Sequence, residues 1–466
     1  MGTSQPTQII ILGGSGDLAK RKLIPALIDL YTHDKLPDTF SIVGLARTPR
    51  TSKEYEQFVA DALTKHEHGH SMTTVKDFCS HFSYVSGSFD NTESYQELKK
   101  HIEAFDAEKG MCTNKLFYLA VPPQYYKTIF NNIHESGLAD TCADGSWARV
   151  LVEKPFGSDL NTAQELDGVL SSLFTEDQIF RIDHYLAKEA VQNILSFRFA
   201  NTLLRSPWNR EHVESVHITM HESIDIQGRG SFYDNIGALR DVGQNHLLQL
   251  LALIAMDEPK SFTAGDIRTK RIEVLECLVP MDSDTVQTQV QRAQYQGYTQ
   301  EKGVAEDSQT ETFFRFTAQL SLPQWEGVPF HVEAGKALSK RKVVIEIHFK
   351  DVASGPFETQ TCHTKGNMVT LTLSPEQAMS ITLNAKKPGH GYQLESQTLS
   401  FTCRKDKQEG IDAYEKVLLD CITGDQTLFT KTEEVLASWK FITSILQNWH
   451  NIPLETYTQG GDGPSL

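Results

Sequence analysis

The chain has 466 residues, of which 39% are hydrophobic and 22% are charged, values typical of an ordinary globular protein with room for two or more domains. The formal net charge of −16 disfavours nucleic acid as a partner, and no apolar run approaches the length of a membrane span, so we expect no membrane partner either. Seven cysteines, an odd count without a CxxC pair, predict reduced thiols in a cytoplasmic protein.

Strand-like apolar runs alternate with helical stretches up to about residue 182. The runs are TQIIIL, FSIVGLA, FSYVSGS, KLFYLAV, ARVLVEK and QIFRI. Between them, residues 52–63 repeat their apolar side chains at helical spacing behind Ser52, a candidate N-cap. Pro25 lies inside the first helical pattern, where we expect a kink or a restart. The alternation predicts a Rossmann-like, doubly wound α/β domain over residues 1–182.

Residues 183–466 follow a different pattern. Beyond residue 210, period-2 alternation predicts the strands SVHITMHESI, VQTQVQRAQY, TETFFRFTAQL, KVVIEIHFK, MVTLTLS, AMSITLNA and QTLSFTC. Few helices are expected until a C-terminal pair, DAYEKVLLDCI and TEEVLASWKFITSILQNW. This pattern predicts an α+β domain with a large, mostly antiparallel sheet and helices on one of its faces.

A glycine-rich loop follows the first predicted strand. Gly13, Gly16 and Ala19 form G-x-x-G-x-x-A, a variant of the dinucleotide fingerprint in which glycines let backbone N–H groups approach a pyrophosphate. An ordinary glycine turn is the alternative, but the place of the loop in the first strand–helix unit favours a nucleotide. The residues expected to contact it are Gly13, Gly14, Ser15, Gly16, Asp17 and Leu18.

The end of the second predicted strand distinguishes two cofactors. Arg47 stands there, where proteins that bind NAD usually carry Asp or Glu. A guanidinium suits a 2′-phosphate, so the sequence predicts NADP, and Arg50 is close enough to share the role. A solvated arginine at the strand end is the alternative.

Four segments bring together acids, bases and cations. RIDHYLAKEA (residues 181–190) lies at the border of the two predicted domains, a usual place for a site. EKPFG (153–157) follows a strand, DVGQNHLLQLL (241–251) begins an apolar helix, and GKALSKRK (335–342) belongs to the strand-rich half. Taken singly, their lysines would be solvent-facing and a helix histidine would be structural.

Together these segments resemble the glucose-6-phosphate dehydrogenase family. GGSGDLAKRKL, EKPFG, RIDHYLAKE, GRGSFYDNIGALRDVGQNHLLQ, VPFHVEAGKAL and IDAYEKVLLD occur in the family's order along nearly the whole chain. The resemblance implies oxidation of D-glucose 6-phosphate to 6-phospho-D-glucono-1,5-lactone with hydride transfer to NADP⁺, the first step of the oxidative pentose phosphate pathway. It also implies a homodimer or homotetramer that pairs through the large sheet.

The resemblance assigns roles to individual residues. His246 would be the general base at the C1 hydroxyl of the sugar, and Asp183 would pair with it and fix its tautomer. His184, Tyr185 and Lys188 would bind the substrate phosphate. The other expected substrate ligands are Lys154, Glu222, Asp241, Lys336 and Arg341, and the other expected cofactor contacts are Tyr118, Lys154 and Pro155.

Three residues depart from the family pattern. Ala187 replaces a usual glycine, Gly243 stands where a bulkier apolar residue is common, and Glu333 stands where an arginine often precedes the glycine–lysine pair. We expect Ala187 to alter the turn before Lys188, Gly243 to loosen the helix of the base, and Glu333 to lower the local positive charge.

Two other functions stay open. Enzymes of the glucose–fructose oxidoreductase type also join a Rossmann domain to an EKP motif and an antiparallel sheet, and a non-catalytic NADP-binding sensor could keep the fold. The RIDHYLAKE segment disfavours the first, and the pairing of Asp183 with His246 disfavours the second. No metal is expected, because KHEHGH (65–70) follows a helical pattern without further ligands nearby.

Overall fold

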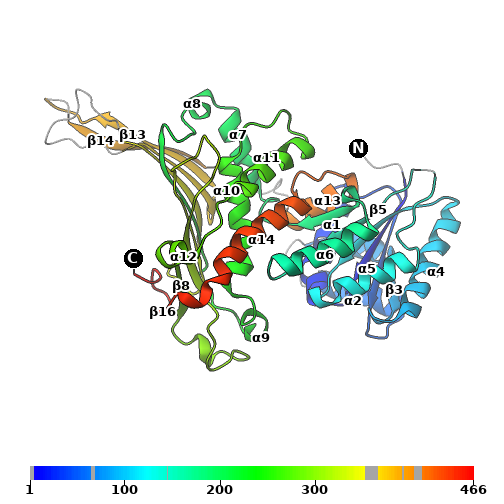
Figure 1. The fold of residues 1–466 in the computed structure, drawn as a ribbon. Helices are drawn as coiled ribbons and strands as arrows, with labels where there is room; N and C mark the ends of the chain where they lie inside the picture. The colour runs from blue at the N-terminus through cyan, green and yellow to red at the C-terminus, as the bar shows by residue number, and fades with distance from the viewer. Residues whose placement is uncertain are drawn as a thin grey trace.

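The structure, a computed structural model, describes residues 5–64, 69–143, 145–351, 366–390, 393–402 and 412–465. Two sheets lie on opposite sides of the molecule, with helices between them and around the first sheet (Figure 1). The predicted combination of an α/β unit and an α+β unit is confirmed.

The first sheet has seven strands in the order β15-β6-β5-β4-β1-β2-β3. Its strands are β1 (Thr7–Leu12), β2 (Phe40–Ala46), β3 (Phe82–Ser86), β4 (Asn114–Leu119), β5 (Ala148–Val152), β6 (Ile179–Ile182) and β15 (Phe429–Thr430). β1 to β6 are parallel, as predicted, and β15 adds an antiparallel edge. The strand order reverses between β1 and β4, which creates a crevice at their carboxyl ends.

Helices cover both faces of this sheet, so its central strands β1 and β4 are buried along their whole length. The helices are α1 (Ile24–Thr32), α2 (Ser52–Leu63), α3 (Met72–Cys79), α4 (Thr92–Lys109), α5 (Tyr126–Glu135) and α6 (Leu160–Leu173), with the short turns η2 (Pro123–Tyr125) and η3 (Glu176–Gln178). A π-helix, η1 (Ala19–Leu23), precedes α1, and Pro25 lies in the first turn of α1. The expected kink or restart takes the form of a change of winding before this proline, since Leu23 and Ile24 keep helical backbone angles. A first-turn proline fits there because that position needs no backbone N–H donor.

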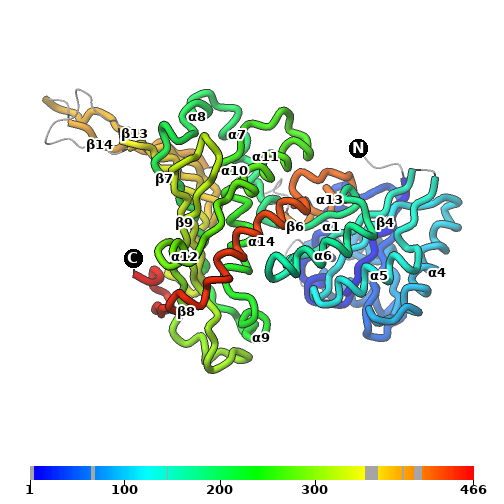
Figure 2. Tube along the Cα trace, viewed as in Figure 1, coloured from blue at the N-terminus to red at the C-terminus, as the bar shows by residue number. Residues whose placement is uncertain are grey.

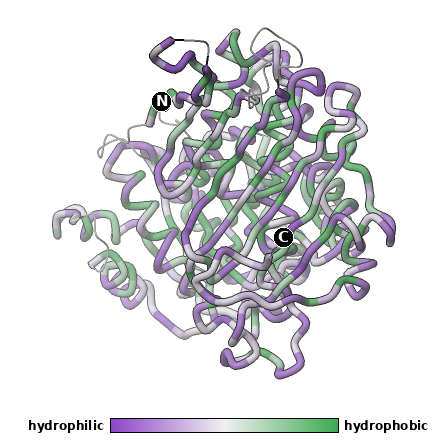
Figure 3. Tube along the Cα trace, turned by 90° about the vertical axis from the view of Figure 1, so that its left-hand side faces the viewer, coloured by the Kyte–Doolittle hydropathy of each residue, from purple (hydrophilic) through white to green (hydrophobic). Residues whose placement is uncertain are grey.

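The second sheet has nine strands in the order β14-β13-β12-β11-β7-β10-β9-β8-β16. They are β7 (Val213–His221), β8 (Val290–Tyr295), β9 (Phe313–Ala318), β10 (Phe330–Gly335), β11 (Lys342–Phe349), β12 (Met368–Ser374), β13 (Ala378–Lys386), β14 (Leu394–Thr402) and β16 (Leu454–Tyr457). Their pairing is antiparallel except between β7 and β10 and between β8 and β16. Figure 3 looks onto the face without helices, where hydrophilic and hydrophobic residues alternate along the strands.

Helices pack on the other face of this sheet, as predicted (Figure 1). They are α7 (Glu189–Phe199), α8 (Thr202–Arg205), α9 (Gly230–Tyr233), π-helix η4 (Leu239–Leu247), α10 (Leu248–Ala255), α11 (Ala264–Glu276), α12 (Ser283–Gln289) and α14 (Thr432–Gln447), with η5 (Tyr298–Gln300) and η6 (Trp449–Asn451). The expectation of few helices in this half is therefore wrong. α12 even occupies the start of the predicted strand VQTQVQRAQY, because Asp282 caps a helix by accepting from the backbone N–H of Thr285.

The last part of the chain returns to the first sheet. α13 (Ala413–Thr423) packs beside α1, β15 pairs with β6, and α14 runs from there to the large sheet (Figure 2). The division of the chain at residue 182 stays a proposal, and these elements join its two parts.

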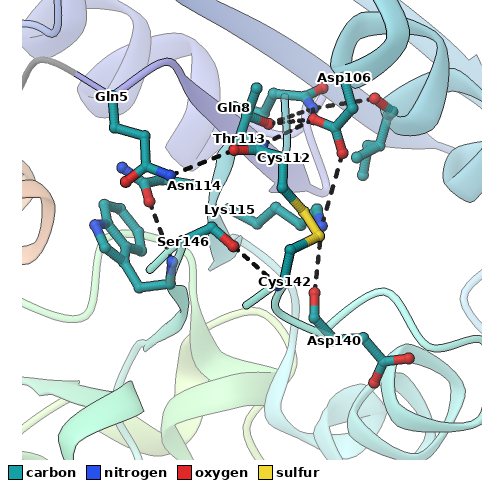
Figure 4. The surroundings of a disulfide bond; sticks show 12 residues. Gln5, Gln8, Asp106, Cys112, Thr113, Asn114, Lys115, Asp140, Cys142 and Ser146 are labelled. Carbon is teal, nitrogen blue, oxygen red and sulfur yellow. Dashed lines mark hydrogen bonds and ion pairs between the residues drawn. A yellow bond between two sulfur atoms is a disulfide. The ribbon is translucent and has the colours of Figure 1, made fainter. Parts of the chain in front are cut away.

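The cysteines differ from the prediction. Cys112, just before β4, forms a disulfide with Cys142, in the segment that leads to β5 (Figure 4). β4 and β5 are neighbours in the sheet, so the approaches to both strands lie side by side and bring the two Cα atoms within 6.2 Å. The expectation that every thiol is reduced is therefore corrected.

Within the described residues, no helix is both long enough and apolar enough to cross a membrane.

Candidate active site

A cavity of about 830 Å³ lies between the two halves of the molecule, at the carboxyl ends of β1, β4 and β5. Its walls come from both sequence halves. The predicted site residues that line it are Leu18, Lys154, Pro155, His184, Tyr185, Lys188, Glu222, Asp241, His246, Lys336 and Arg341. The structure therefore brings together the segments that the sequence singled out.

The glycine loop turns tightly between β1 and η1. Gly13 has φ +90°, and its N–H donates to the carbonyl of Leu45 at 2.8 Å. A Cβ on Gly13 would lie 2.3 Å from the carbonyl oxygen of Ala120, so only glycine fits there. Gly16 has no such obstacle beyond the loop's own backbone, which leaves one side open for a phosphate.

Two arginines follow β2 beside this loop. Arg47 is exposed, and the phenol of Tyr84 holds the backbone around it by donating to the carbonyls of Ala46 and Thr48. Arg50 stacks its guanidinium 5.0 Å from the ring centre of Phe58. Among the described residues, the Nε of Arg50 is a buried donor without an acceptor, so this corner can still accept an anion.

One lining residue of the cavity, His246, is paired with a buried carboxylate that does not itself line the cavity. His246, on η4, donates its Nδ1–H to the Oδ1 of Asp183 at 2.6 Å. The same carboxylate oxygen accepts the backbone N–H of Tyr185 at 2.9 Å, which fixes its direction. Both side chains are at most 3% exposed. A carboxylate at Nδ1 places the ring proton there and leaves the Nε2 lone pair free to accept a proton.

Burial and charge set the protonation states of this pair. Burial acts to raise the pKa of Asp183, but the charge and hydrogen bond of His246 outweigh it and hold that pKa well below its usual value. Burial lowers the pKa of His246, and the Lys154 ammonium adds to the effect against the opposing charge of Asp183. The pair therefore holds a carboxylate and a neutral imidazole at neutral pH, which is the state a general base requires.

Lys154 lies over the free nitrogen of the imidazole. Its Nζ is 3.2 Å from the Nε2 of His246 and donates to the backbone carbonyl of Asp241 at 2.9 Å. Burial acts to raise the pKa of Asp241, but Lys154 and Lys336 lower it to about 2. A second cation, Lys336, is ion-paired with Glu222 and lies 3.6 Å from Asp241. These alternating charges can orient a polyhydroxylated ligand.

The end of the cavity that holds Lys188 and Arg341 is cationic. Lys188 is the N-cap residue of α7, and its Nζ lies 3.3 Å from the ring centre of Tyr185. Burial and the charge of Arg341 lower the pKa of Lys188 to about 8. His184 packs 4.6 Å from the ring of His246, and burial lowers its pKa well below the usual value. This end suits a phosphate dianion.

The structure shows the surroundings of the residues that depart from the family pattern. Ala187 is buried and adopts an ordinary negative φ, and the turn closes through the N–H of Lys188 and the carbonyl of Tyr185, so the turn needs no glycine. At Gly243 a Cβ would lie 2.9 Å from Phe314, whose ring fills the space instead.

Glu333 does not line the cavity. It accepts from Arg315 at 2.6 Å and contacts His221 at 2.6 Å, so its charge is balanced within the sheet. The negative charge of Glu333 therefore acts within the sheet and not at the cavity, which corrects the expectation that it lowers the positive charge of the site.

Some residues of the cavity escaped the sequence analysis. Glu153 accepts from the phenol of Tyr118 at 2.7 Å, and burial raises its pKa. Tyr118 itself is fully buried and outside the cavity wall, so it reaches the site only through Glu153. Tyr414, on α13, lines the cavity beside Lys22. The EKP motif already included Glu153, whereas no local pattern could place α13 against α1.

The histidine-rich segment adds nothing to this site. His66 and His68 lie outside the described residues, and His70 contacts a carboxylate oxygen of Asp29 at 2.9 Å. Within the described part of the chain, no three His, Cys, Asp or Glu residues are arranged to hold a metal ion.

Comparisons with known proteins agree over the whole chain. The model of the glucose-6-phosphate dehydrogenase NAD-binding domain matches residues 10–193, and the model of the C-terminal domain of the same family matches residues 195–466. Glucose-6-phosphate 1-dehydrogenase of Chlamydia muridarum is 36% identical over 463 residues, which cover 96% of this chain and 91% of that protein.

Solved structures give the same result. A glucose-6-phosphate dehydrogenase in complex with its substrate glucose 6-phosphate has a TM-score of 0.90 at 37% identity, covering 100% of this chain and 97% of that one. The glucose-6-phosphate 1-dehydrogenase of Mycobacterium avium has a TM-score of 0.87 at 31% identity, covering 99% and 96%.

Proposed function

The chain belongs to the glucose-6-phosphate dehydrogenase family, and from this premise we propose that it transfers the hydride of glucose 6-phosphate to NADP⁺ through the side chains of the cavity. The reaction is the oxidation of D-glucose 6-phosphate to 6-phospho-D-glucono-1,5-lactone. The observation that carries the proposed roles is the buried contact of Asp183 with His246, which itself lines the cavity.

In the proposed mechanism, His246 accepts the proton of the C1 hydroxyl at its Nε2. Asp183 holds the ring by its Nδ1–H and stabilises the imidazolium that forms. Lys154 contacts Nε2 in the structure, so the substrate hydroxyl takes over that position and leaves Lys154 to its bond with Asp241. When bound, the nicotinamide supplies the acceptor of the C1 hydride.

The phosphate of the substrate would bind at the cationic end, through His184, Tyr185 and Lys188, with Arg341 nearby. Glu222, Asp241 and Lys336 would contact the sugar. Binding energy gained at the phosphate then supports the orientation of C1 at the other end of the sugar.

The residues present fit a dinucleotide. The open side of Gly16 and the tight turn at Gly13 suit a pyrophosphate, and Arg47 with Arg50 suit a 2′-phosphate, which favours NADP over NAD. The cytoplasmic location and the homodimer or homotetramer expected from the resemblance stay proposals.

Initial rates with NADP and NAD test the choice of cofactor. Charge-assisted hydrogen bonds contribute about 1.5–3 kcal/mol, so Arg47→Ala and Arg50→Ala should each raise the KM for NADP by about tenfold or more. The KM for NAD should stay unchanged. Arg205→Ala, an exposed arginine on α8, is the control. Equal losses with both cofactors, or a wild-type enzyme that uses both equally well, would contradict the proposal.

A further inference from the structure

The loop that carries Lys336 and Arg341 has an unusual backbone. It joins β10 to β11, and we call residues 336–341 the Lys336 loop. Ala337 has φ +50°, in the left-handed region that residues other than glycine and asparagine seldom adopt. A loop held in this conformation needs support from outside itself.

Part of that support comes from the carbonyls of Glu222 and Ile224, which accept the N–H groups of Leu338 and Ala337. Further support comes from residues 457–462, which begin at the end of β16 and which we call the bracing segment (Figure 1). It bonds to the Lys336 loop at successive positions. The phenol of Tyr457 donates to the carbonyl of Lys336 at 2.7 Å, and the N–H of Gly460 donates to the carbonyl of Ala337 at 2.8 Å. Ser339 bonds twice to the segment. Its N–H donates to the carbonyl of Gly461 at 2.7 Å, and its hydroxyl donates to Asp462 at 2.6 Å.

Tyr457 is the buried centre of this contact. Its side chain is 3% exposed and packs among the rings of Tyr295 and Phe313. Its phenol oxygen lies 2.9 Å from the hydroxyl of Thr312, and the carbonyl of Thr312 accepts the N–H of Lys336 at 2.9 Å. The backbone of Lys336 is therefore held on its N–H side by Thr312 and on its carbonyl side by Tyr457.

We propose that the bracing segment positions the Lys336 loop for the sugar phosphate, and that Tyr457 is its main positioning residue. Tyr457 does not line the cavity, so it acts only through the loop. A loop ordered in advance loses little conformational freedom when the ligand binds, which improves affinity without a new contact to the ligand. This inference rests on the proposed function, since it takes Lys336 and Arg341 as substrate ligands.

Tyr457→Phe tests the proposal, because it removes one oxygen and keeps the packed ring. The loss of one net hydrogen bond should raise the KM for glucose 6-phosphate about three- to tenfold. The kcat and the KM for NADP should stay within about twofold, because η4 and the glycine loop are untouched. A merely structural loss would instead lower activity with both ligands alike.

Tyr295→Phe is the matched control. Tyr295 lies opposite Tyr457 in the paired strand, is 1% exposed, and donates its phenol to Glu301 rather than to the loop. Its removal should leave the KM for glucose 6-phosphate unchanged. The proposal is overturned if Tyr457→Phe leaves that KM unchanged, or if Tyr295→Phe raises it equally.

Lys336→Ala separates this inference from the function on which it rests. Lys336→Ala should raise the KM for glucose 6-phosphate. In that variant, the further change Tyr457→Phe should raise the KM by a smaller factor than it does in the wild type, since the effects of residues that act through one another are not additive. An unchanged KM in Lys336→Ala would overturn the role of Lys336 and this inference together. A raised KM there, with full additivity of Tyr457→Phe, would overturn this inference alone.

Discussion

At the scale of single residues, the cavity places a proton acceptor close to cationic groups. His246 is neutral because burial outweighs the charge of Asp183, and Lys188 has a lowered pKa because burial and Arg341 both disfavour its ammonium. His246 is therefore held ready to accept a proton, and Lys188 loses its proton at a pH of about 8.

Lys188 should give the enzyme a pH dependence on the alkaline side. Its pKa of about 8 means that the ammonium is present below pH 8 and is lost as the pH rises through that value. The KM for glucose 6-phosphate should therefore rise above pH 8. Lys188→Arg should remove this rise, because a guanidinium stays charged to a pH of about 12. A rise that persists in Lys188→Arg would assign it to another group; KM measured from pH 6 to 10 decides.

The residues of the site were more predictable than their contacts. The resemblance supplied Asp183, Lys188 and His246 by motif; Lys188 and His246 line the cavity, and Asp183 contacts His246. The motif could not show that Lys154 contacts Nε2 of His246, because a flexible lysine side chain takes its position from the charges around it. Nor could it show that Tyr118 is fully buried beneath Glu153.

At the scale of elements, η4 carries both Asp241 and His246 as a π-helix that continues into α10. π-helical segments occur frequently at functional sites. The sequence predicted an apolar helix at this place but not its winding, since the apolar pattern of α10 dominates the signal. Gly243 lets the ring of Phe314 approach this helix closely.

Gly243→Ala should reduce activity without the usual gain of stability. A mid-helix alanine normally stabilises by about 0.5–1 kcal/mol relative to glycine, but here the Cβ would meet Phe314 at 2.9 Å and overpacking costs about 1–3 kcal/mol. We expect a lower kcat and a free energy of unfolding no higher than that of the wild type. Gly168→Ala in α6, where a Cβ meets nothing within 4 Å, should stabilise and keep full activity. A more stable, fully active Gly243→Ala would contradict this reading of the helix.

The remaining element errors come from competing local signals. α2 begins behind Thr51 rather than Ser52, because Thr51 and Glu54 form a capping box while the Ser52 hydroxyl accepts the N–H of Tyr84. β15 was missed because two residues carry no periodic signal, and they form a strand only by pairing with β6.

At the scale of the whole molecule, ion pairs of buried arginines connect elements of the two parts of the chain. Arg181, at the start of the RIDHYL motif on β6, pairs with Asp167 and Glu176, and Arg268 on α11 also pairs with Glu176. Arg271 pairs with Glu434 of α14, and both are at most 1% exposed. No local sequence pattern predicts the pairs of Arg268 with Glu176 and of Arg271 with Glu434, because their partners lie far apart in the chain.

Glu434→Gln should destabilise the protein strongly, because it leaves the buried charge of Arg271 without a counter-charge. Breaking a buried pair in this way costs about 3–5 kcal/mol, which should lower the midpoint of urea unfolding. The adjacent Glu433 pairs with Lys431 at the surface, so Glu433→Gln should change stability by at most about 1 kcal/mol. Equal midpoints for the two variants would show that the buried pair does not hold α14 to α11.

The most direct test of the account is the turnover of His246→Asn with glucose 6-phosphate and NADP, followed by the absorbance of the reduced nicotinamide. A positioned general base contributes about 10²–10⁴-fold, so kcat should fall by that factor, while calorimetry should show glucose 6-phosphate and NADP still binding with near wild-type affinity. A variant that turns over at a rate close to that of the wild type would contradict the assignment of His246 as the base.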